Sequence, residues 1–448
     1  MIERRVFLKS AVAAAAAIPF QAFLARAAEP THKGGLRRGQ TAGYGPLFET
    51  ADQTTGLPLL MLPEGFKYLS FGWRGDMMSN GQPTPSAHDG MATFDVGNGR
   101  TRLVRNHELD GLRTPFTDAR YDPGTGGGTT TLEFDTHKGE LIGSWPSLSG
   151  TVRNCAGGRT PWGSWLTCEE TNFFSTLPHG YIFEVPVDGM GLPTPLRAMG
   201  RFSHEAVAVD PATGYVYETE DAGTSSGFYR FVPAAPGNLA AGGALSMLKV
   251  KNVSLANLGA SYPNGTTFDV EWVPIANPDN PASNSPGNFV WKQGRALNAA
   301  TFARLEGCWY GDDQRIYIVS TSGGSIVQGQ IWVYDPAEET ITLLFESPDP
   351  EVLNMPDNIT VSPRGGIVLC EDGSGIEYLH GLAVDGEIFR FAQNNVKLNG
   401  ERNGIAGDFT GSEWAGATYS PDGHWLFVNI QSPGITFAIT GPWKSGAL

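Results

Sequence analysis

The chain of 448 residues has few cysteines and, beyond its N-terminus, no apolar run that approaches 18 residues. Its four cysteines are too few for a disulfide scaffold, although one or two bridges would suit an oxidising compartment. Basic residues are also in deficit, 31 against 46 acidic ones, so the net charge is −15. Nucleic acids require clustered lysine and arginine, and the charge balance therefore argues against a nucleic-acid partner. No His-Glu-x-x-His or Cys-x-x-Cys motif occurs, which removes two common metal and redox signatures.

The N-terminus has the three parts of a signal peptide. Paired arginines, Arg4 and Arg5, precede an apolar run over residues 11–20, and Ala25 and Ala27 form a small-residue cleavage site. The arginine pair favours the twin-arginine export machinery. A membrane anchor is the alternative, but the apolar run is too short to span a bilayer. We predict a signal peptide over 1–27 and a mature protein that is periplasmic or secreted, with no stable membrane insertion.

The rest of the chain repeats one cassette of strand, turn and strand. The clearest copies are VAVDPATGYVYETED from Val207, ITVSPRGGIVLCED from Ile359 and ATYSPDGHWLFVNIQ from Ala417. A third strand follows several copies, for example GQIWVYDP from Gly329. About six such units, rich in Gly and Pro turns, are typical of a β-propeller rather than a sandwich. We therefore predict an all-β protein, a six-bladed propeller with inserted loops: an N-terminal extension over 28–60, one catalytic domain over 61–448, and an irregular insertion at about 235–300.

The second strands of these units end in acidic residues. Equivalent positions of propeller blades surround one axis, so four of the six copies are expected to deliver carboxylates to one rim of the channel: Glu108, Glu169 with Glu170, Glu220 with Asp221, and Glu371 with Asp372. Like charges at such spacing repel by several kcal/mol at intermediate dielectric. Hard oxygen ligands in this number favour Ca²⁺. For any single acid, a solvated loop charge is the simpler interpretation, but four aligned sets predict a metal site.

Three further features lie close to these acids in the sequence. Cys168 directly precedes Glu169, and its thiolate would suit a transition metal, although a buried thiol or a disulfide with Cys155 or Cys370 fits the spacing equally well. Neighbouring side chains of a strand point to opposite faces, so only one of His204 and Glu205 should face the channel. Arg304 and Glu306 would share one face of an extended strand. Their pairing fits a plain ion pair, or a bidentate phosphate clamp beside a metal cluster.

Several longer strings resemble the PhoX-type alkaline phosphatases. They are NHE (106–108), GGRTPWGSWLTCEE (157–170), HEAVAVDPATGYVYETED (204–221), GQIWVYDP (329–336), PDNITVSPRGGIVLCED (356–372) and FVNIQSPGITFAITGPW (427–443), in the same order as in that family. The resemblance runs from about residue 60 to the C-terminus. It implies a twin-arginine-exported propeller that hydrolyses phosphomonoesters with a mixed iron–calcium cluster.

The resemblance also implies a set of site residues. The iron ligands would be Cys168, Glu205 and Glu306, and Arg304 would contact the phosphate. The calcium ligands would be Glu169, Glu108, Asp221, Asp357, Asn358 and Glu371. The expected cofactors are Ca²⁺ and Fe³⁺, and Arg304, Glu306 and Cys168 are the expected catalytic residues. Two other functions remain open: a calcium-dependent propeller hydrolase such as a lactonase, which needs neither the thiolate nor the arginine, and a non-catalytic calcium-binding propeller.

Overall fold

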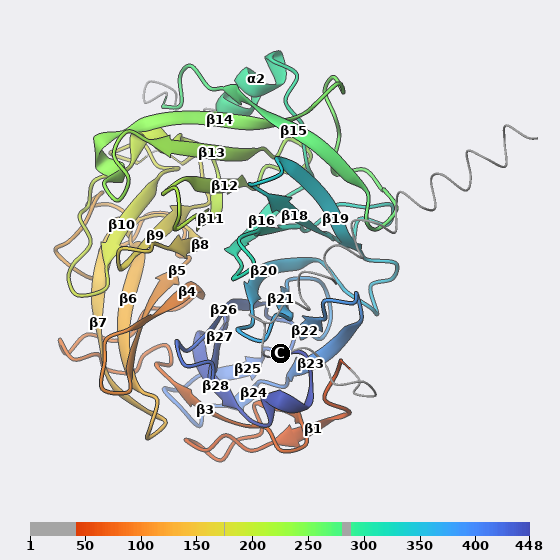
Figure 1. Ribbon diagram of the computed structural model, residues 1–448. Coiled ribbons are helices and arrows are strands. Elements are labelled where there is room, and N and C mark those ends of the chain that lie inside the picture. The colour runs from red at the N-terminus through yellow and green to blue at the C-terminus, as the bar shows by residue number, and fades with distance from the viewer. Residues whose placement is uncertain (1–41, 174, 280–287) are drawn as a thin grey trace, which may run out of the picture.

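Antiparallel β-strands arranged around a central axis make up nearly all of the regular structure (Figure 1). The computed structural model describes residues 42–173, 175–279 and 288–448. The predicted signal peptide, 1–27, lies outside these ranges, as do residues 28–41 of the predicted extension. Within the described ranges, no helix is long and apolar enough to cross a membrane.

Six inner strands line the axis, and each contacts the next until the ring closes. Around the ring they are β4 (His88–Asp95), β8 (Asn154–Arg159), β11 (His204–Val209), β16 (Leu305–Tyr310), β20 (Pro356–Val361) and β26 (Trp414–Tyr419). Each pairs with the strand that follows it in the sequence: β5 (Arg100–His107), β9 (Ser164–Glu169), β12 (Val216–Glu220), β17 (Ile316–Ser320), β21 (Ile367–Glu371) and β27 (Leu426–Ile430).

The remaining strands extend these hairpins outward. They are β6 (Gly127–Asp135), β7 (Glu140–Thr151), β10 (Ile182–Pro186), β13 (Phe228–Pro233), β18 (Gln330–Asp335), β19 (Thr340–Glu346), β22 (Tyr378–Leu382), β23 (Ile388–Asn394) and β28 (Ile435–Thr440). The short strands β24 (Lys397–Asn399) and β25 (Ala406–Asp408) pair with each other in a separate two-stranded sheet. The three 3-10 helices of the described ranges are Arg197–Met199, Leu239–Ala241 and Trp443–Ser445. The predicted all-β propeller is confirmed.

The blade number of six stays a prediction, because the sheets do not separate into six units. Residues 235–300, predicted as an irregular insertion, contain β14 (Gly243–Val250), β15 (Thr267–Pro274) and helix α2 (Phe289–Ala296). β14 and β15 continue the sheet of β11–β13, and β15 also pairs with β19. The two neighbouring units are thereby joined into one sheet of nine strands.

The two ends of the described chain close the ring. β3 (Lys67–Phe71) pairs with β28, the last strand of the sequence, so an N-terminal strand completes the C-terminal sheet. β1 (Leu47–Thr50) and β2 (Leu60–Pro63) pair with each other, and β2 pairs with β23. Residues 47–60, predicted as part of an extension, are therefore integrated into a propeller sheet.

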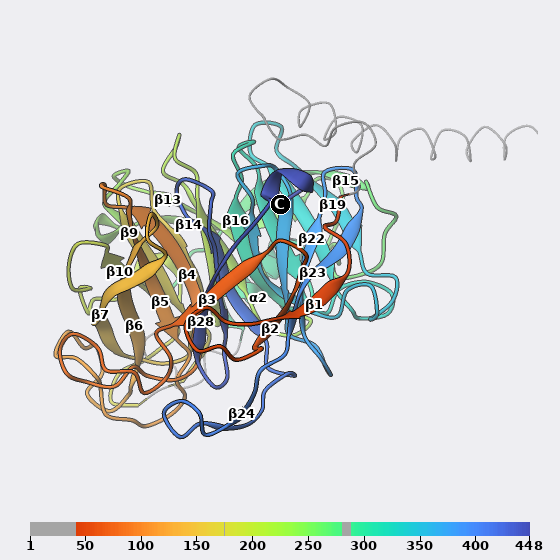
Figure 2. The same cartoon turned by 90° about the horizontal axis from the view of Figure 1, so that it is seen from below.

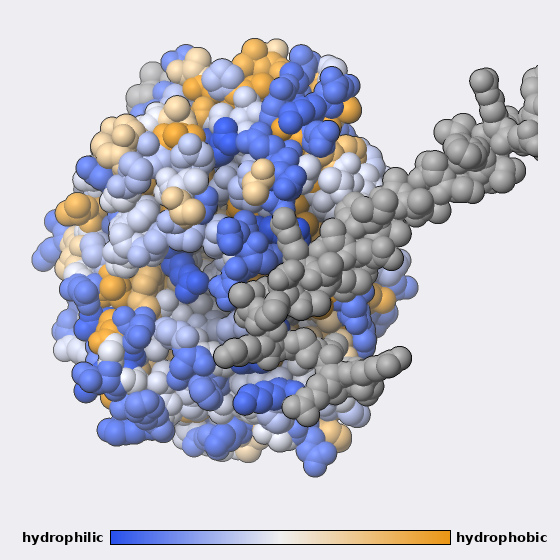
Figure 3. All heavy atoms as spheres, in the orientation of Figure 1, coloured by the Kyte–Doolittle hydropathy of each residue, from blue (hydrophilic) through white to orange (hydrophobic). Residues whose placement is uncertain are grey.

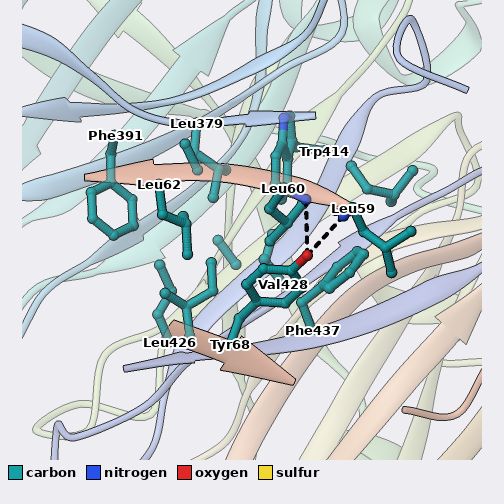
Figure 4. Close-up of a cluster of buried hydrophobic side chains, with 14 of the residues drawn as sticks. Leu59, Leu60, Leu62, Tyr68, Leu379, Phe391, Trp414, Leu426, Val428 and Phe437 are labelled. Atoms are coloured by element: carbon teal, nitrogen blue, oxygen red, sulfur yellow. Dashed lines mark hydrogen bonds between the residues drawn. The ribbon is translucent and has the colours of Figure 1, made fainter. Parts of the chain in front are cut away.

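A continuous hydrophobic cluster fixes this closure (Figure 4). Leu60, Trp414 and Phe437, from three different strands, are each fully buried in it. The Tyr68 hydroxyl accepts hydrogen bonds from the Leu59 and Leu60 amides at 2.8 and 3.1 Å and donates to the Thr50 carbonyl at 2.9 Å. Each fully buried large apolar side chain contributes about 2 kcal/mol to stability, so packing is the main contribution to the closure. The hydrogen bonds of Tyr68 satisfy the polar groups buried beside it.

The turn chemistry of the repeat is visible at Asp210. Its carboxylate accepts hydrogen bonds from the Ala212 amide (2.9 Å) and the Thr213 hydroxyl (2.6 Å), and Gly214 follows with φ +73°. An Asx turn followed by a left-handed glycine reverses the chain between β11 and β12. The Asp-Pro-x-x-Gly string of the sequence therefore forms the hairpin that it predicted.

Candidate metal centre

The inner strands all start at one end of the channel. Their far ends turn back on the other face, where Arg364, in the turn after β20, donates to the Leu448 carbonyl at 2.6 Å. Figure 2 shows the C-terminal end and β24 on opposite faces of the molecule. The Asn403 side chain, in the β24–β25 turn, donates a hydrogen bond to the Arg74 carbonyl. The Arg74 amide in turn donates a hydrogen bond to the Gly434 carbonyl. Gly434 packs on His88, the first residue of β4, so the inner strands start on the β24 face.

A shared irregularity marks the start of these strands. In five of the six, the first residue pairs with the neighbouring strand and the next two residues do not. Such a bulge re-aims a side chain and is common beside active sites. The first bulged residue is acidic or a thiol in every case: Asp89, Cys155, Glu205, Glu306 and Asp357.

The residue after each of these is small in four of the five strands, because the strands approach closely. A Cβ on Gly307 would lie 2.7 Å from the Asp357 carbonyl oxygen, and one on Gly90 would lie 2.5 Å from the Ala156 Cα. Backbone contact of this kind brings the bulged acids of neighbouring strands together. Asn358 holds the corresponding position in β20 and is buried there.

Among the described residues, four overlapping groups of potential metal ligands form from the bulged residues, the ends of the second strands and Glu413, which directly precedes β26. Within each group the ligand atoms lie within 4.8 Å of one another. The groups are Cys155, Glu170 and Glu205; Glu205, Glu306 and Asp357; Asp357, Asp372 and Glu413; and Asp89, Glu108 and Glu413. Because Glu205, Asp357 and Glu413 each belong to two groups, the four form one chain of ligands along the channel rim.

The electrostatics of this rim require positive charge. Burial raises the pKa of Glu205, Glu306, Asp89 and Glu413 well above the ordinary range, and repulsion from neighbouring carboxylates adds to it. Burial and the same repulsion raise the pKa of Glu170 and of Asp357 to about 8, although nearby arginines oppose the shift. Burial likewise raises the pKa of the Cys155 thiol. Bound cations reverse such shifts, and the donor set therefore fits metal ions.

Three strand-end acids have a different role. Glu169 accepts hydrogen bonds from the amides of Val152 (3.0 Å), Gly180 (2.8 Å) and Tyr181 (3.1 Å), and His179 Nδ1 lies 2.6 Å from its carboxylate. Its two oxygens are thus occupied by protein donors.

Glu371 and Glu220 are bound in the same way. Glu371 accepts from the Asn354 and Tyr378 amides at 2.8 and 3.0 Å, and Glu220 accepts from the Gly227 amide and the Tyr229 hydroxyl. The residues that follow them, Asp221 and Asp372, point the other way, as strand alternation requires. The structure therefore does not bring the predicted ligands Glu169 and Glu371 to the cluster.

Cys168 is also absent from the four groups. It is fully buried on β9 in a hydrophobic cluster with Leu166, Val207 and Tyr229. Cys155 lies on β8, the inner strand that pairs with β9, and it is the cysteine that joins the cluster in the position expected of Cys168. All four cysteines are free and buried, so no disulfide forms among them.

The other predicted residues divide between the cluster and its edge. Glu205 and Glu306 meet in one group with Asp357, and Glu108 belongs to another. His204 points away from the channel: it stacks on Phe202 with ring centroids 3.6 Å apart, and burial lowers its pKa to about 3. Asp221 joins none of the four groups, and Asn358 is buried directly after Asp357 in β20.

Arg304 lies at the edge of the cluster. Its Nη2 is 2.6 Å from Glu306 Oε1, and its Nε is 3.4 Å from Asp221 Oδ2. Its side chain remains 30% exposed, so it can reach a molecule in the channel mouth. Burial lowers the pKa of Arg304, but Glu306 and Asp221 outweigh that effect and raise it, so the guanidinium stays charged.

Sequence reasoning missed Cys155, Asp89, Glu413 and Arg153, and it mentioned Glu170 and Asp372 only as strand-end acids. The signal for Cys155 and Asp89 was present in the sequence: aligning the starts of the first strands, rather than the ends of the second, places both in register with Glu205, Glu306 and Asp357.

A separate cavity of about 400 Å³ lies at the other end of the channel, lined by Arg159, Trp309 and Pro421 among others, and none of the clustered carboxylates lines it. Figure 3 shows that face, the one that carries the C-terminus, with hydrophilic residues around a central hollow.

The raised carboxylate pKa values predict how the metal-free protein responds to pH. A group whose pKa is higher in the folded state stabilises it below the unfolded value and loses that contribution as the pH rises through the folded one. For Glu170 and Asp357 this window runs from about 4 in the unfolded chain to about 8 in the fold. We expect the chelated protein to melt at a lower temperature at pH 9 than at pH 6, and calcium to reduce the difference. Equal melting temperatures with chelator at both pH values would contradict this prediction.

A closed ring of antiparallel β-sheets, with carboxylates and a thiol at one end of its channel, defines a metal-dependent β-propeller enzyme. The chain belongs to the family described as alkaline phosphatase PhoX, whose model matches residues 42–434. The predicted family is thus confirmed, and with it the class of phosphoric ester hydrolases. The chain matches no curated protein sequence at a significant level.

A solved structure supports the fold. The chain is similar to Pseudomonas fluorescens PhoX in complex with vanadate, a transition state analogue, with 18% identity, a TM-score of 0.67, and coverage of 91% of this chain and 99% of that one. A gluconolactonase from Xanthomonas campestris, XC5397, also matches, with 13% identity over 90% of this chain and all of the other, but its TM-score is only 0.39.

Proposed function

We propose that the protein is an exported phosphatase that hydrolyses phosphate monoesters with a mixed iron–calcium centre at the β24 face of the channel. The observation that carries the proposal is the chain of four ligand groups with Arg304 at its edge. Vanadate bound to Pseudomonas PhoX supports it, because vanadate stands in for a phosphoryl group in transfer. The membership of the PhoX family supports the same reaction.

The ligand chemistry suggests how the metals divide. Groups made only of carboxylates suit calcium, which prefers hard oxygen ligands. The group with Cys155 combines a thiolate with two carboxylates and suits a transition metal, which we take to be iron. We therefore assign Cys155, Glu170 and Glu205 to the iron side of the centre, together with Glu306, which shares a group with Glu205 and which the resemblance to PhoX implies as an iron ligand. Asp357, Asp372, Asp89, Glu108 and Glu413 are assigned to the calcium side.

The chain's own residues would bind and orient the phosphate. When bound, the metal ions would act as Lewis acids that neutralise phosphate oxygens. Arg304 is held from both sides: its amide donates to the Gly223 carbonyl at 2.7 Å, and its carbonyl accepts from Thr321 at 2.9 Å. Its guanidinium is further fixed by Glu306 and Asp221, so it meets the phosphoryl group already oriented. Charge that spreads over the phosphoryl oxygens in the transition state would be stabilised by this fixed cation.

The test is hydrolysis of p-nitrophenyl phosphate at alkaline pH by protein exported in its own host, with iron and calcium counted on the same sample. We expect turnover that chelation abolishes and calcium restores. Bound metal without turnover of any phosphate ester would refute the phosphatase and leave the lactonase-like hydrolase or the non-catalytic binding propeller.

Export also remains a proposal, because residues 1–27 lie outside the described ranges. Its support is the pair Arg4 and Arg5 ahead of the apolar run. Replacing both arginines by lysine should retain the protein in the cytoplasm, as judged by cell fractionation. Undiminished export of the double variant would refute the twin-arginine route.

A further inference from the structure

We propose that Arg153 is a second phosphate-binding arginine, which grips the phosphoryl group of the monoester opposite Arg304. The inference rests on the proposed function and specifies its substrate site. It starts from the repeat. Arg153 directly precedes the inner strand β8, as Arg304 directly precedes β16.

The two arginines share a backbone setting. Their φ angles are +47° and +48°, and the carbonyl of each accepts a 2.9 Å hydrogen bond from the residue after the second strand, Glu170 or Thr321. Ala87 and Met355 adopt the same left-handed φ before β4 and β20, so the conformation belongs to the ring. The guanidinium is what distinguishes the two positions.

The two guanidiniums also share a pattern of ion pairs. Arg153 Nη2 lies 2.7 Å from Glu108 Oε1 and also contacts Glu170. Glu170 belongs to its own repeat, and Glu108 ends the second strand of the preceding one. Arg304 is bound in the same way, by Glu306 of its own repeat and by Asp221 at the end of the preceding second strand.

The arginines lie on either side of Glu205 in the ring of inner strands. Between β8 and β16 lies β11, which carries Glu205. Glu205 is shared by the group that contains Glu170 and the group that contains Glu306. Each of these two groups thus has one arginine on its carboxylate. A phosphoryl group bound across both groups would meet one guanidinium on each side.

Arg153 has donors left for such a ligand. Its ion pairs with Glu108 and Glu170 use Nη2 alone, and its Nε is buried with no hydrogen-bond acceptor among the described residues. A buried donor without a partner is uncommon and calls for one. The side chain is nevertheless 36% exposed, so part of the guanidinium faces the channel mouth. Arg102, which also bridges two carboxylates, uses Nε on Glu133 and Nη1 on Asp188 and lies near the start of β5, at the strand end opposite Glu108.

Two arginines and the metals have a consequence for specificity. A monoester dianion offers three unesterified oxygens, whereas a diester offers two and carries one negative charge less. A site with a cation on each side of the phosphoryl group therefore discriminates in favour of monoesters. Loss of Arg153 should weaken phosphate binding and reduce that discrimination together.

The experiment compares R153Q, R153K, R304Q and the control R102Q with the wild type, all metal-loaded. The measurements are the Kd of inorganic phosphate by calorimetry, KM and kcat for p-nitrophenyl phosphate and its bis-aryl diester, and the iron and calcium content.

For R153Q we expect phosphate binding about 10- to 100-fold weaker, as for the loss of charge-assisted hydrogen bonds, with a similar fall in the monoester-to-diester ratio of kcat/KM. R153K should keep the metals and bind phosphate more weakly than the wild type, because lysine lacks the planar fork. R102Q should match the wild type.

The outcomes separate a phosphate ligand from a structural cation. If R153K keeps its metals and binds phosphate with the wild-type Kd and specificity, Arg153 only balances Glu108 and Glu170, and the inference is wrong. An unchanged Kd in a metal-replete R153Q would overturn it equally. Failure of the proposed function looks different: the metal-loaded wild type would then hydrolyse neither ester, while calorimetry would still report whether Arg153 contributes to phosphate binding.

Discussion

Replacing Cys155 by alanine is expected to remove the transition metal and at least about 100-fold of the activity, because changes to mere supporting groups of metal sites already cost about 10- to 100-fold. Cys155 is the one thiol within 4.8 Å of clustered carboxylates. Its Sγ lies 3.4 Å from the His204 carbonyl oxygen and 3.6 Å from that of Glu205, at the start of β11. Iron and calcium would be counted in the purified protein, and turnover of p-nitrophenyl phosphate measured beside them.

C168A provides the matched control, because it removes the same atom from a second buried thiol. Cys168 packs among apolar side chains, so its loss should cost about 1 kcal/mol of stability, as for other small core truncations, and leave the metals in place. Metal loss in C168A with a normal complement in C155A would restore the ligand assignment that the resemblance implied. Metal loss in both would show that thiol packing, rather than ligation, holds the centre together.

The sequence was informative about the fold because the repeat is local. Turn residues such as Asp210 and Gly214 fix each hairpin through contacts only a few residues apart, so the strand cassette can be recognised without knowing what lies around it. The pairing of β3 with β28 and of β15 with β19 could not be predicted in this way. Both join segments far apart in the sequence, and no local pattern encodes them.

The candidate site was predictable in its location but not in its members. Strand ends pointed to the rim where the potential ligands cluster. Adjacent acids such as Glu169 and Glu170, however, face opposite sides of a strand, and only the packing around β9 decides which one reaches the channel. The same applies to Cys155 and Cys168, since both are buried cysteines in one hairpin. The bulge that turns Cys155 into the channel depends on the neighbouring strands, so the sequence shows the register that Cys155 shares with Glu205 and Glu306 but not the direction of its side chain.

Glu169, the last residue of β9, and Glu170, which follows it, test which of two adjacent acids at a strand end reaches the channel. E169Q should cost about 3 kcal/mol or more of unfolding free energy with and without metal, because it leaves a buried histidine without the nearer of its two charged partners. The cause is local: His179 lies between Glu169 and Asp122, and burial lowers its pKa, but the two carboxylates outweigh burial and raise it. The metal content of this variant should stay normal.

E170Q should have the opposite effects. Glu170 belongs to the group with Cys155 and Glu205, so its amide should weaken metal binding and reduce turnover by at least about tenfold. In chelator at pH 9, however, E170Q should melt at a higher temperature than the wild type. The reason is that ionised Glu170, with its pKa raised to about 8, destabilises the metal-free fold at that pH, and glutamine mimics the protonated form. Thermal melts at pH 6 and pH 9, with chelator and with calcium, measure both variants against the wild type. If E169Q loses metal while E170Q keeps it, the glutamate that faces the channel is Glu169, and the alternation inferred for the other strand ends fails with it.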